Sequence, residues 1–271
     1  MRCESRQRLA VVSLGCPKNL VDSERLCALL AEAGYAVGAD MDDAEVILIS
    51  TSALLQTARH EALGVIDEAL DLKRRGPARR VVVAGCLATR DGADLLAARP
   101  DVDAIVGVDS RDRIVQAVRG DARDLTGPYT GGIADDRGRF RLTAPHTAYL
   151  RVAEGCGRNC TFCTIPGIRG PFRSKPPERV LAEARELARA GAVEVNLIAQ
   201  DTTGYGADLD GRTSLAGLLT ALDAERLVPW LRVMYAYPTG FDDALIDALA
   251  ARESVVPYVD PERTQNFARE V

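Results

Sequence analysis

The fold of this chain is decided by the stretch Leu9–Ala33, LAVVSLGCPKNLVDSERLCALLAEA. Its apolar start, Leu9–Leu14, has the length of a buried strand and ends at a Gly-Cys-Pro turn. From about Val21 to Ala33 the apolar residues recur at helical spacing, and Asn19 or Asp22 is expected to cap this helix. A strand that leads directly into a helix is the repeating unit of an α/β fold.

The same strand–helix unit recurs three times in the first half of the chain. Because strands that alternate with helices pair in parallel, we predict an N-terminal open parallel α/β sheet domain over residues 1–125. The expected strands are Val46–Ile49, Arg80–Ala84 and Ala104–Val106, and the expected helices are Thr57–Leu72, one opening at Asp91, and Ser110–Arg119.

The chain changes character after the first domain. Residues 126–146 are rich in turn signals and read as a linker, with a short hairpin around Arg139–Leu142. Residues 147–271 then resume the α/β pattern and predict a partial (β/α) barrel. Its expected strands are Tyr149–Val152, Val193–Ile198, Leu231–Tyr235 and Val255–Tyr258, and its expected helices are Pro177–Ala190, Ser214–Leu222 and Asp242–Ala250.

The composition is that of an ordinary globular protein, with 47% hydrophobic and 27% charged residues. No apolar run is long enough to cross a membrane, and the N-terminus lacks the apolar core of a signal peptide. We therefore expect a cytoplasmic protein with no membrane partner. The net charge of −5 provides no general attraction to nucleic acid.

Three of the seven cysteines, Cys156, Cys160 and Cys163, form a C-x3-C-x2-C pattern directly after a predicted strand. Three thiolates on one loop can hold three irons of a [4Fe–4S] cluster and leave the fourth iron open. The alternative is a zinc site, which needs a fourth protein ligand, and His146 is the available candidate.

Three further polar positions, Cys16, Ser52 and Cys86, follow the ends of predicted strands. The carboxyl ends of parallel strands meet at one edge of a sheet, so these positions can converge there. The alternative is that the cysteines are small buried hydrophobic residues. Cys27 is expected to fill the core, and Cys3 has no assigned role.

The three-cysteine pattern, with Phe162 before its last cysteine, resembles the radical S-adenosylmethionine superfamily. The resemblance implies that the open iron chelates the amino and carboxylate groups of S-adenosylmethionine. An electron from the cluster then cleaves the sulfonium to a 5′-deoxyadenosyl radical that abstracts hydrogen from carbon. By the same resemblance, Phe162 would lie against the adenine.

The resemblance narrows to the methylthiotransferases, and within them to the RimO-type branch that methylthiolates an aspartate of small-subunit ribosomal protein twelve. It implies a sulfur-group transferase that acts on this protein or the ribosome, takes electrons from a donor, and binds its cofactor near Gln200 and Asp201. A tRNA methylthiotransferase is the alternative within the family. The motifs that carry the resemblance are Ser13–Glu24, Glu154–Cys156, Ile165–Ser174, Gln200–Gly206 and Tyr235–Phe241.

The family binds a second [4Fe–4S] cluster through three cysteines, and the resemblance places two of them at Cys16 and Cys86. The third position holds Ser52, within a loop that departs from the family as far as Ala58. A serine alkoxide is a harder and more basic donor than a thiolate and binds iron–sulfur clusters poorly. We therefore expect the second cluster, and with it thiolation, to be impaired.

The match to the family stops near Tyr258, and no strand pattern follows it. The family continues with the rest of the radical domain and a small C-terminal β-barrel domain. The sequence therefore predicts a truncated radical domain over residues 147–271 without the β-barrel domain. A non-catalytic, iron–sulfur-binding truncated paralogue is the alternative from another functional class.

Overall fold

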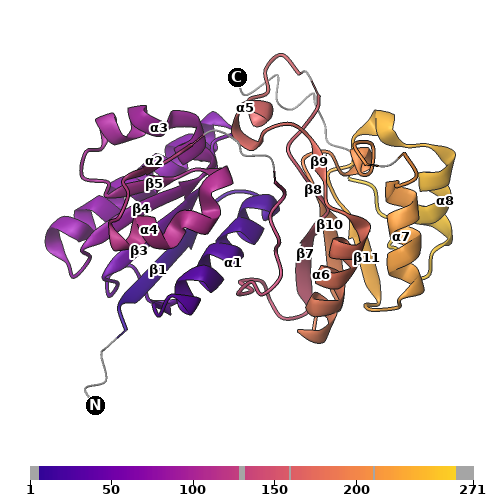
Figure 1. Cartoon of the computed structure of the whole chain (residues 1–271), viewed down its shortest axis with the longest axis horizontal. Helices are drawn as coiled ribbons and strands as arrows, with labels where there is room; N and C mark the ends of the chain where they lie inside the picture. Colours follow the sequence, from indigo (N-terminus) through magenta and orange to yellow (C-terminus); the bar gives the residue numbers. More distant parts are fainter. Residues whose placement is uncertain (1–5, 128–131, 159, 210, 261–271) are drawn as a thin grey trace. The chain divides into compact units, whose positions relative to one another are not determined.

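The computed structural model describes residues 6–127, 132–158, 160–209 and 211–260 (Figure 1). The chain divides into two compact units. The N-terminal unit takes its described residues from 6–127 and 138–140, and the second unit takes them from 132–137 and 141–260.

The N-terminal unit is built on a six-stranded sheet in the order β2-β1-β3-β4-β5-β6, with every neighbouring pair parallel. This confirms the predicted open parallel sheet. The strands β2 and β6 were not predicted, because two residues are too few for an apolar period to show. The strand bounds are β1 Arg8–Ser13, β2 Ala36–Val37, β3 Val46–Thr51, β4 Arg80–Gly85, β5 Ala104–Val106 and β6 Asp124–Leu125.

Both faces of this sheet are covered by helices, because the central strands carry apolar side chains on both faces of the sheet. Ile47 and Ile49 of β3 pack in one core with the helices α2 and α3, whereas Val46 and Leu48 pack in the other with α1 and α4. The helices are α1 Pro17–Glu32, α2 Gln56–Arg75, α3 Cys86–Ala98 and α4 Ile114–Arg119, and the 3-10 turn η1 Val108–Arg113 precedes α4.

Helix α1 begins at Pro17, earlier than the predicted Val21, because proline at the first helical position fixes φ for the helix. The predicted cap by Asn19 or Asp22 is wrong, since both lie inside the helix and Cys16 occupies the cap position. The amide of Asn19 instead donates to Leu14 O at 2.6 Å and to Ser50 Oγ at 3.1 Å.

Two other helix starts also differ from the prediction. Helix α3 begins at Cys86 rather than at Asp91, because Gly85 at φ 95° turns the chain directly from β4 into the helix. The helical geometry is interrupted at Gly92 (φ 38°). Ser110 lies within η1, and α4 begins only at Ile114.

The second unit contains a three-stranded parallel sheet in the order β11-β10-β7, covered by helices that share its core. Its strands are β7 Thr147–Arg151, β10 Glu194–Ile198 and β11 Trp230–Val233, and its long helices are α6 Pro177–Arg189, α7 Leu215–Ala224 and α8 Asp243–Ala251. The predicted β/α alternation is confirmed for these elements.

The predicted fourth strand of this unit is reduced to one parallel bridge between Val255 and Leu231. Beyond it, Tyr258 N donates to Val256 O at 2.7 Å, so the backbone bonds to itself and does not continue the ladder. A small antiparallel pair, β8 Ala153–Glu154 with β9 Arg173–Ser174, and the short helix α5 Ile165–Arg169 were not predicted.

The hairpin expected around Arg139–Leu142 is wrong. No strand occurs there among the described residues. Instead, Phe140 N donates to Glu24 O at 3.0 Å, and Arg139 Nε lies 3.0 Å from the Glu24 carboxylate, with both side chains buried. This buried pair holds the segment in place of strand pairing. In the described part of the chain, no helix is both long and apolar enough to span a membrane.

Candidate cofactor site

The loop of residues 155–163, here called the three-cysteine loop, follows β8 and is pressed against the segment that leads to β9. Gly155 adopts φ 77°, and a Cβ atom on it would lie 2.1 Å from Pro171 O and 2.6 Å from Gly170 O. Cys156 N donates to Gly170 O at 3.3 Å. A side chain at position 155 would break this contact, so glycine is required at the entry to the loop.

The three cysteines of the loop are all half-buried. Burial raises the pKa of the Cys156 thiol above its ordinary value, and the nearby charges of Asp201, Cys163 and Cys160 raise it further. Within the described residues, no three His, Cys, Asp or Glu side chains converge on a single metal ion. An iron–sulfur cluster does not need such convergence, because its thiolates bind different irons, and the donor chemistry of the loop fits that group.

The zinc alternative is not supported by the position of His146. This residue lies directly before β7, where its carbonyl accepts hydrogen bonds from Val193 N and Glu194 N. The three-cysteine loop lies beyond the carboxyl end of β7, so the strand separates His146 from the thiols. A closed zinc site needs a fourth ligand beside the other three.

Arg158 ties the three-cysteine loop to the ends of the two neighbouring strands. Its Nε lies 2.8 Å from Asp201 Oδ2, beyond β10. Its Nη1 donates to Thr239 Oγ1 at 3.2 Å, and its guanidinium lies 3.9 Å from the centre of the Tyr237 ring, both beyond β11. Arg158 is not predictable from the sequence, since nothing in its spacing distinguishes it from other arginines.

The predicted S-adenosylmethionine residues lie at the carboxyl end of β10 and on the loop. Gln200 is buried, and its Oε1 atom has no hydrogen-bond partner among the residues described. Asp201 is also buried and accepts from Thr203 Oγ1 and Gly204 N. Phe162 lies on the loop with 42% of its surface exposed. An unpaired buried acceptor costs about 1–3 kcal/mol, so Gln200 fits a ligand that brings an N–H or O–H donor.

A chain of buried ions holds both sides of the three-cysteine loop. Glu154, directly before the loop, accepts from Arg151 Nη1 and from Arg169 Nη1, each at 2.7 Å. Arg169 ends α5, after the loop. Because the carboxylate pairs with arginines on both sides, it fixes the strand before the loop relative to the helix after it.

The same ions continue into the core of the second unit. Arg151 Nε donates to Asp136 Oδ2 at 2.9 Å, and Lys175 Nζ lies 3.0 Å from the same oxygen and 2.6 Å from Glu183 Oε2. The network contains three cationic and three anionic side chains, and all six are almost completely buried. The balance of charge is what allows such groups inside a protein.

In the N-terminal unit, Cys16, Ser52 and Cys86 lie just beyond the carboxyl ends of the neighbouring strands β1, β3 and β4. A Cβ atom on Gly15 would lie 2.4 Å from Ser52 Cβ, and one on Gly85 would lie 2.7 Å from Thr51 O. The structure therefore brings the ends of these three strands close together.

The donor set at this strand edge does not fit a three-thiolate cluster site. The side chains available there are two half-buried thiols, of Cys16 and Cys86, and the hydroxyl of Ser52. Hydroxyl oxygen is a poor ligand for iron–sulfur clusters, so these three residues do not complete a second cluster site.

The remaining cysteines have no part in either site. Cys27 is buried in the N-terminal unit, where burial, and then the charge of Glu24, raises the pKa of its thiol to about 12. A thiol with that pKa remains protonated and unreactive, which agrees with its predicted role in the core. Cys3 lies outside the described residues.

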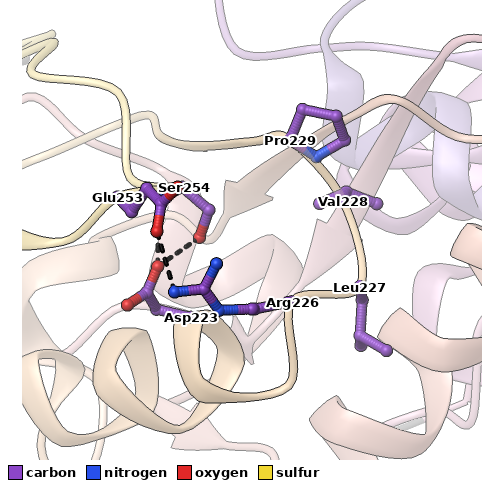
Figure 2. A pocket seen from close by; sticks show the side chains of 7 residues that line it. All are labelled: Asp223, Arg226, Leu227, Val228, Pro229, Glu253 and Ser254. Atoms are coloured by element: carbon purple, nitrogen blue, oxygen red, sulfur yellow. Dashed lines mark hydrogen bonds and ion pairs between the residues drawn. The ribbon is translucent and has the colours of Figure 1, made fainter.

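A separate pocket of about 330 Å³ lies at the amino end of β11, at the opposite end of that strand from Tyr237 and Thr239 (Figure 2). Its polar groups satisfy one another. Ser254 N and Oγ donate to Asp223 at 2.9 and 2.6 Å and hold the pKa of that carboxyl below its usual range. Arg226 pairs with Glu253 at 2.8 Å. This pairing leaves the pocket without a reactive group.

Two family models match this chain. Residues 8–107 match the uncharacterized protein family UPF0004, and residues 150–262 match the radical SAM superfamily. The fold, the cysteine pattern and these matches define a radical SAM protein with an N-terminal UPF0004 domain.

Curated relatives narrow this class. The ribosomal protein uS12 methylthiotransferase RimO of Geotalea uraniireducens is 39% identical over 96% of this chain, and that of Gloeobacter violaceus is 42% identical over 93%. The chain belongs to this RimO family of radical SAM methylthiotransferases. It spans 59% and 57% of the lengths of these two relatives.

A solved structure shares the fold. The radical S-adenosylmethionine methyltransferase TsrM from Kitasatospora setae, with a tryptophan substrate and a SAM analogue bound, superposes with a TM-score of 0.61. The alignment covers 92% of this chain and 58% of TsrM, at 15% sequence identity. At that identity the similarity concerns the fold alone.

Proposed function

We propose that this chain is a radical SAM protein of the methylthiotransferase type, in which Cys156, Cys160 and Cys163 bind one [4Fe–4S] cluster beside S-adenosylmethionine. The observation that carries this proposal is the half-buried three-cysteine loop, tied by Arg158 to Asp201 and adjoining the unpaired acceptor of Gln200. The family reaction is methylthiolation of an aspartate of ribosomal protein uS12, with electrons from an external donor. A ribosomal substrate places the protein in the cytoplasm.

The residues of the chain have distinct roles in this proposal. When bound, the cluster and S-adenosylmethionine would supply a 5′-deoxyadenosyl radical for hydrogen abstraction. Gly155 and the Glu154–Arg169 pair hold the loop in shape, and Arg158 fixes it against the ends of β10 and β11. Gln200 Oε1 would accept a hydrogen bond from the bound cofactor, and Phe162 would lie against its adenine.

The domain assignment belongs to the same proposal. We assign residues 1–125 to the N-terminal methylthiotransferase domain, 126–146 to the linker, and 147–271 to the radical domain. The three-cysteine site then falls entirely within the radical domain.

The experiment that tests the proposed function is S-adenosylmethionine cleavage. The reconstituted, chemically reduced chain should form 5′-deoxyadenosine, and the variant with all three loop cysteines changed to Ala should form none. Transfer is tested separately, by mass spectrometry for a methylthio increment on the uS12 aspartate. Equal nucleoside formation by the wild type and the variant contradicts the proposal.

A second candidate function is cluster binding without methylthiolation, and Ser52 is the observation that favours it. In the family, thiolation depends on the second cluster, and the hydroxyl at position 52 weakens that site. The same two measurements, nucleoside formation and mass spectrometry of uS12, distinguish the two functions. 5′-Deoxyadenosine without any methylthio increment supports the second candidate, whereas a stoichiometric increment supports the methylthiotransferase.

A further inference from the structure

A pocket of about 250 Å³ lies at the amino ends of β1, β3 and β4. Three arginines line it: Arg79 and Arg80 at the start of β4, and Arg119 at the end of α4. Cys16 and Ser52 follow the carboxyl ends of the same strands. The pocket therefore lies at the opposite edge of the sheet and belongs to no site described above.

The three arginine side chains have no anionic partner. In the described portion of the chain, none of them forms an ion pair or donates a side-chain hydrogen bond. The Nε atom of Arg80 is shielded from solvent as well as unpaired. The carboxylate in the pocket, Glu45, instead accepts from the backbone N of Arg8 at 3.0 Å. The pocket thus has an excess of positive charge, although the whole chain carries −5.

The guanidinium of Arg80 is seated against Gly120, directly after α4. Gly120 is in the left-handed conformation at φ 94°, and a Cβ atom on it would lie 2.6 Å from Arg80 Nη1 and 2.8 Å from Nη2. A residue with a side chain would displace the guanidinium. The absence of a side chain at Gly120 therefore makes room for this guanidinium. Because the arginine is already held in place, its side chain loses less conformational entropy when a ligand binds.

We propose that this pocket binds a phosphate group. Arginine presents a planar set of N–H donors that matches the oxygens of phosphate, and three such groups around one cavity supply both the charge and the donors that a phosphate needs. A buried, unpaired Arg80 Nε is a cost in the free protein that an anionic acceptor would remove. The phosphate can come from a small molecule or from the backbone of single-stranded RNA.

The test measures binding of inorganic phosphate and of a ten-nucleotide oligouridylate to the full chain by calorimetry at low salt. We expect saturable binding of at least one probe, and a loss of about tenfold in affinity in Arg80→Gln and in Arg119→Gln, because each removes a charge-assisted contact. Arg189→Gln on α6 is the matched control, because it removes the same charge from an exposed, unpaired arginine of the other unit.

The two probes distinguish the source of the phosphate. Oligouridylate that binds more tightly than phosphate, with an affinity that falls as salt rises, identifies RNA. Phosphate that binds as tightly as the oligonucleotide identifies a small molecule. Arg119 is exposed, so its variant keeps the test valid even where Arg80→Gln lowers stability. Absence of saturable binding for both probes, or an equal loss in Arg189→Gln, overturns the proposal. Neither probe depends on iron, so failure here leaves the proposed function untouched.

Discussion

At the scale of the residue, Gly155 determines whether the three-cysteine loop can form. We expect Gly155→Ala to abolish cluster loading and to destabilise the second unit by about 1–3 kcal/mol, because φ 77° and the 2.1 Å approach to Pro171 O both exclude a side chain. Gly157→Ala is the matched control in the same loop, since its Cβ would meet only Phe172 Cβ at an ordinary 3.7 Å. Iron content and thermal unfolding measure both effects. Normal iron in Gly155→Ala would show that the loop does not need this conformation.

Ser52 determines the state of the second strand-end site. We expect Ser52→Cys to raise iron from about four to about eight per chain after reconstitution, because it supplies the third soft thiolate. Gly15 already packs against Ser52, so the new sulfur would enter a loop that lies beside Cys16.

The control for this prediction is the double variant Ser52→Cys, Cys16→Ala, which should return to about four irons. If iron in the single variant does not rise, the loops that carry Cys16, position 52 and Cys86 do not present their sulfur atoms to one cluster.

Cys27 gives the N-terminal unit a pH dependence. In the folded protein its thiol keeps its proton up to a pKa of about 12, whereas an unperturbed thiol loses it near 9.0. Between these values the unfolded state binds fewer protons, so the free energy of unfolding falls as pH rises. Denaturant unfolding at pH 8 and 10 should show a loss about 1 kcal/mol larger in the wild type than in Cys27→Ala. Equal losses would contradict the raised pKa.

At the scale of the element, the buried pairing between Glu154, Arg151 and Arg169 fixes α5 beside the three-cysteine loop. We expect Glu154→Gln to destabilise the second unit by about 3–5 kcal/mol, because it removes the carboxylate charge that two buried arginines share. Glu253→Gln is the control: it breaks an ion pair whose side chains are about three-quarters exposed, and should change stability by less than about 1 kcal/mol. Denaturant midpoints that fall equally in the two variants would contradict the role of burial.

The long elements were predictable because burial leaves a clear pattern in them. The apolar runs of β1, β3 and β4 gave the N-terminal sheet, and the predicted helix over Pro177–Ala190 differs from α6 by one residue. Helix starts at Pro17 and Cys86 were missed, because a proline and a left-handed glycine set them rather than the apolar period. Short elements such as β2 contain too few residues to show a period.

The candidate site was predictable in its thiols but not in its supports. Cys156, Cys160 and Cys163 are close in sequence, so their spacing alone points to a cluster. Arg158 acts through Asp201 and Thr239, which are far away along the chain and meet it only after β10 and β11 have paired. The buried ions were missed for the same reason, since Asp136 reaches Arg151 from a segment without regular structure.

At the scale of the whole molecule, each unit has its own core and its own candidate site. The three-cysteine loop and all its described supports lie in the second unit, whereas Cys16, Ser52 and Cys86 lie in the N-terminal unit. The two sites therefore share no ligand residue. They also differ in donor chemistry, because one offers three thiols and the other offers two thiols and a hydroxyl. One complete thiolate site and one incomplete site predict a single cluster for the chain.

The central claim is tested most directly by iron and sulfide analysis of the wild-type chain after anaerobic reconstitution. We predict about four irons and about four sulfides per chain. Replacing Cys156, Cys160 and Cys163 by Ala should remove nearly all of both, whereas Cys27→Ala should not change them. Two results would contradict a single cluster on the three-cysteine loop: bound zinc in place of iron, or about eight irons per wild-type chain.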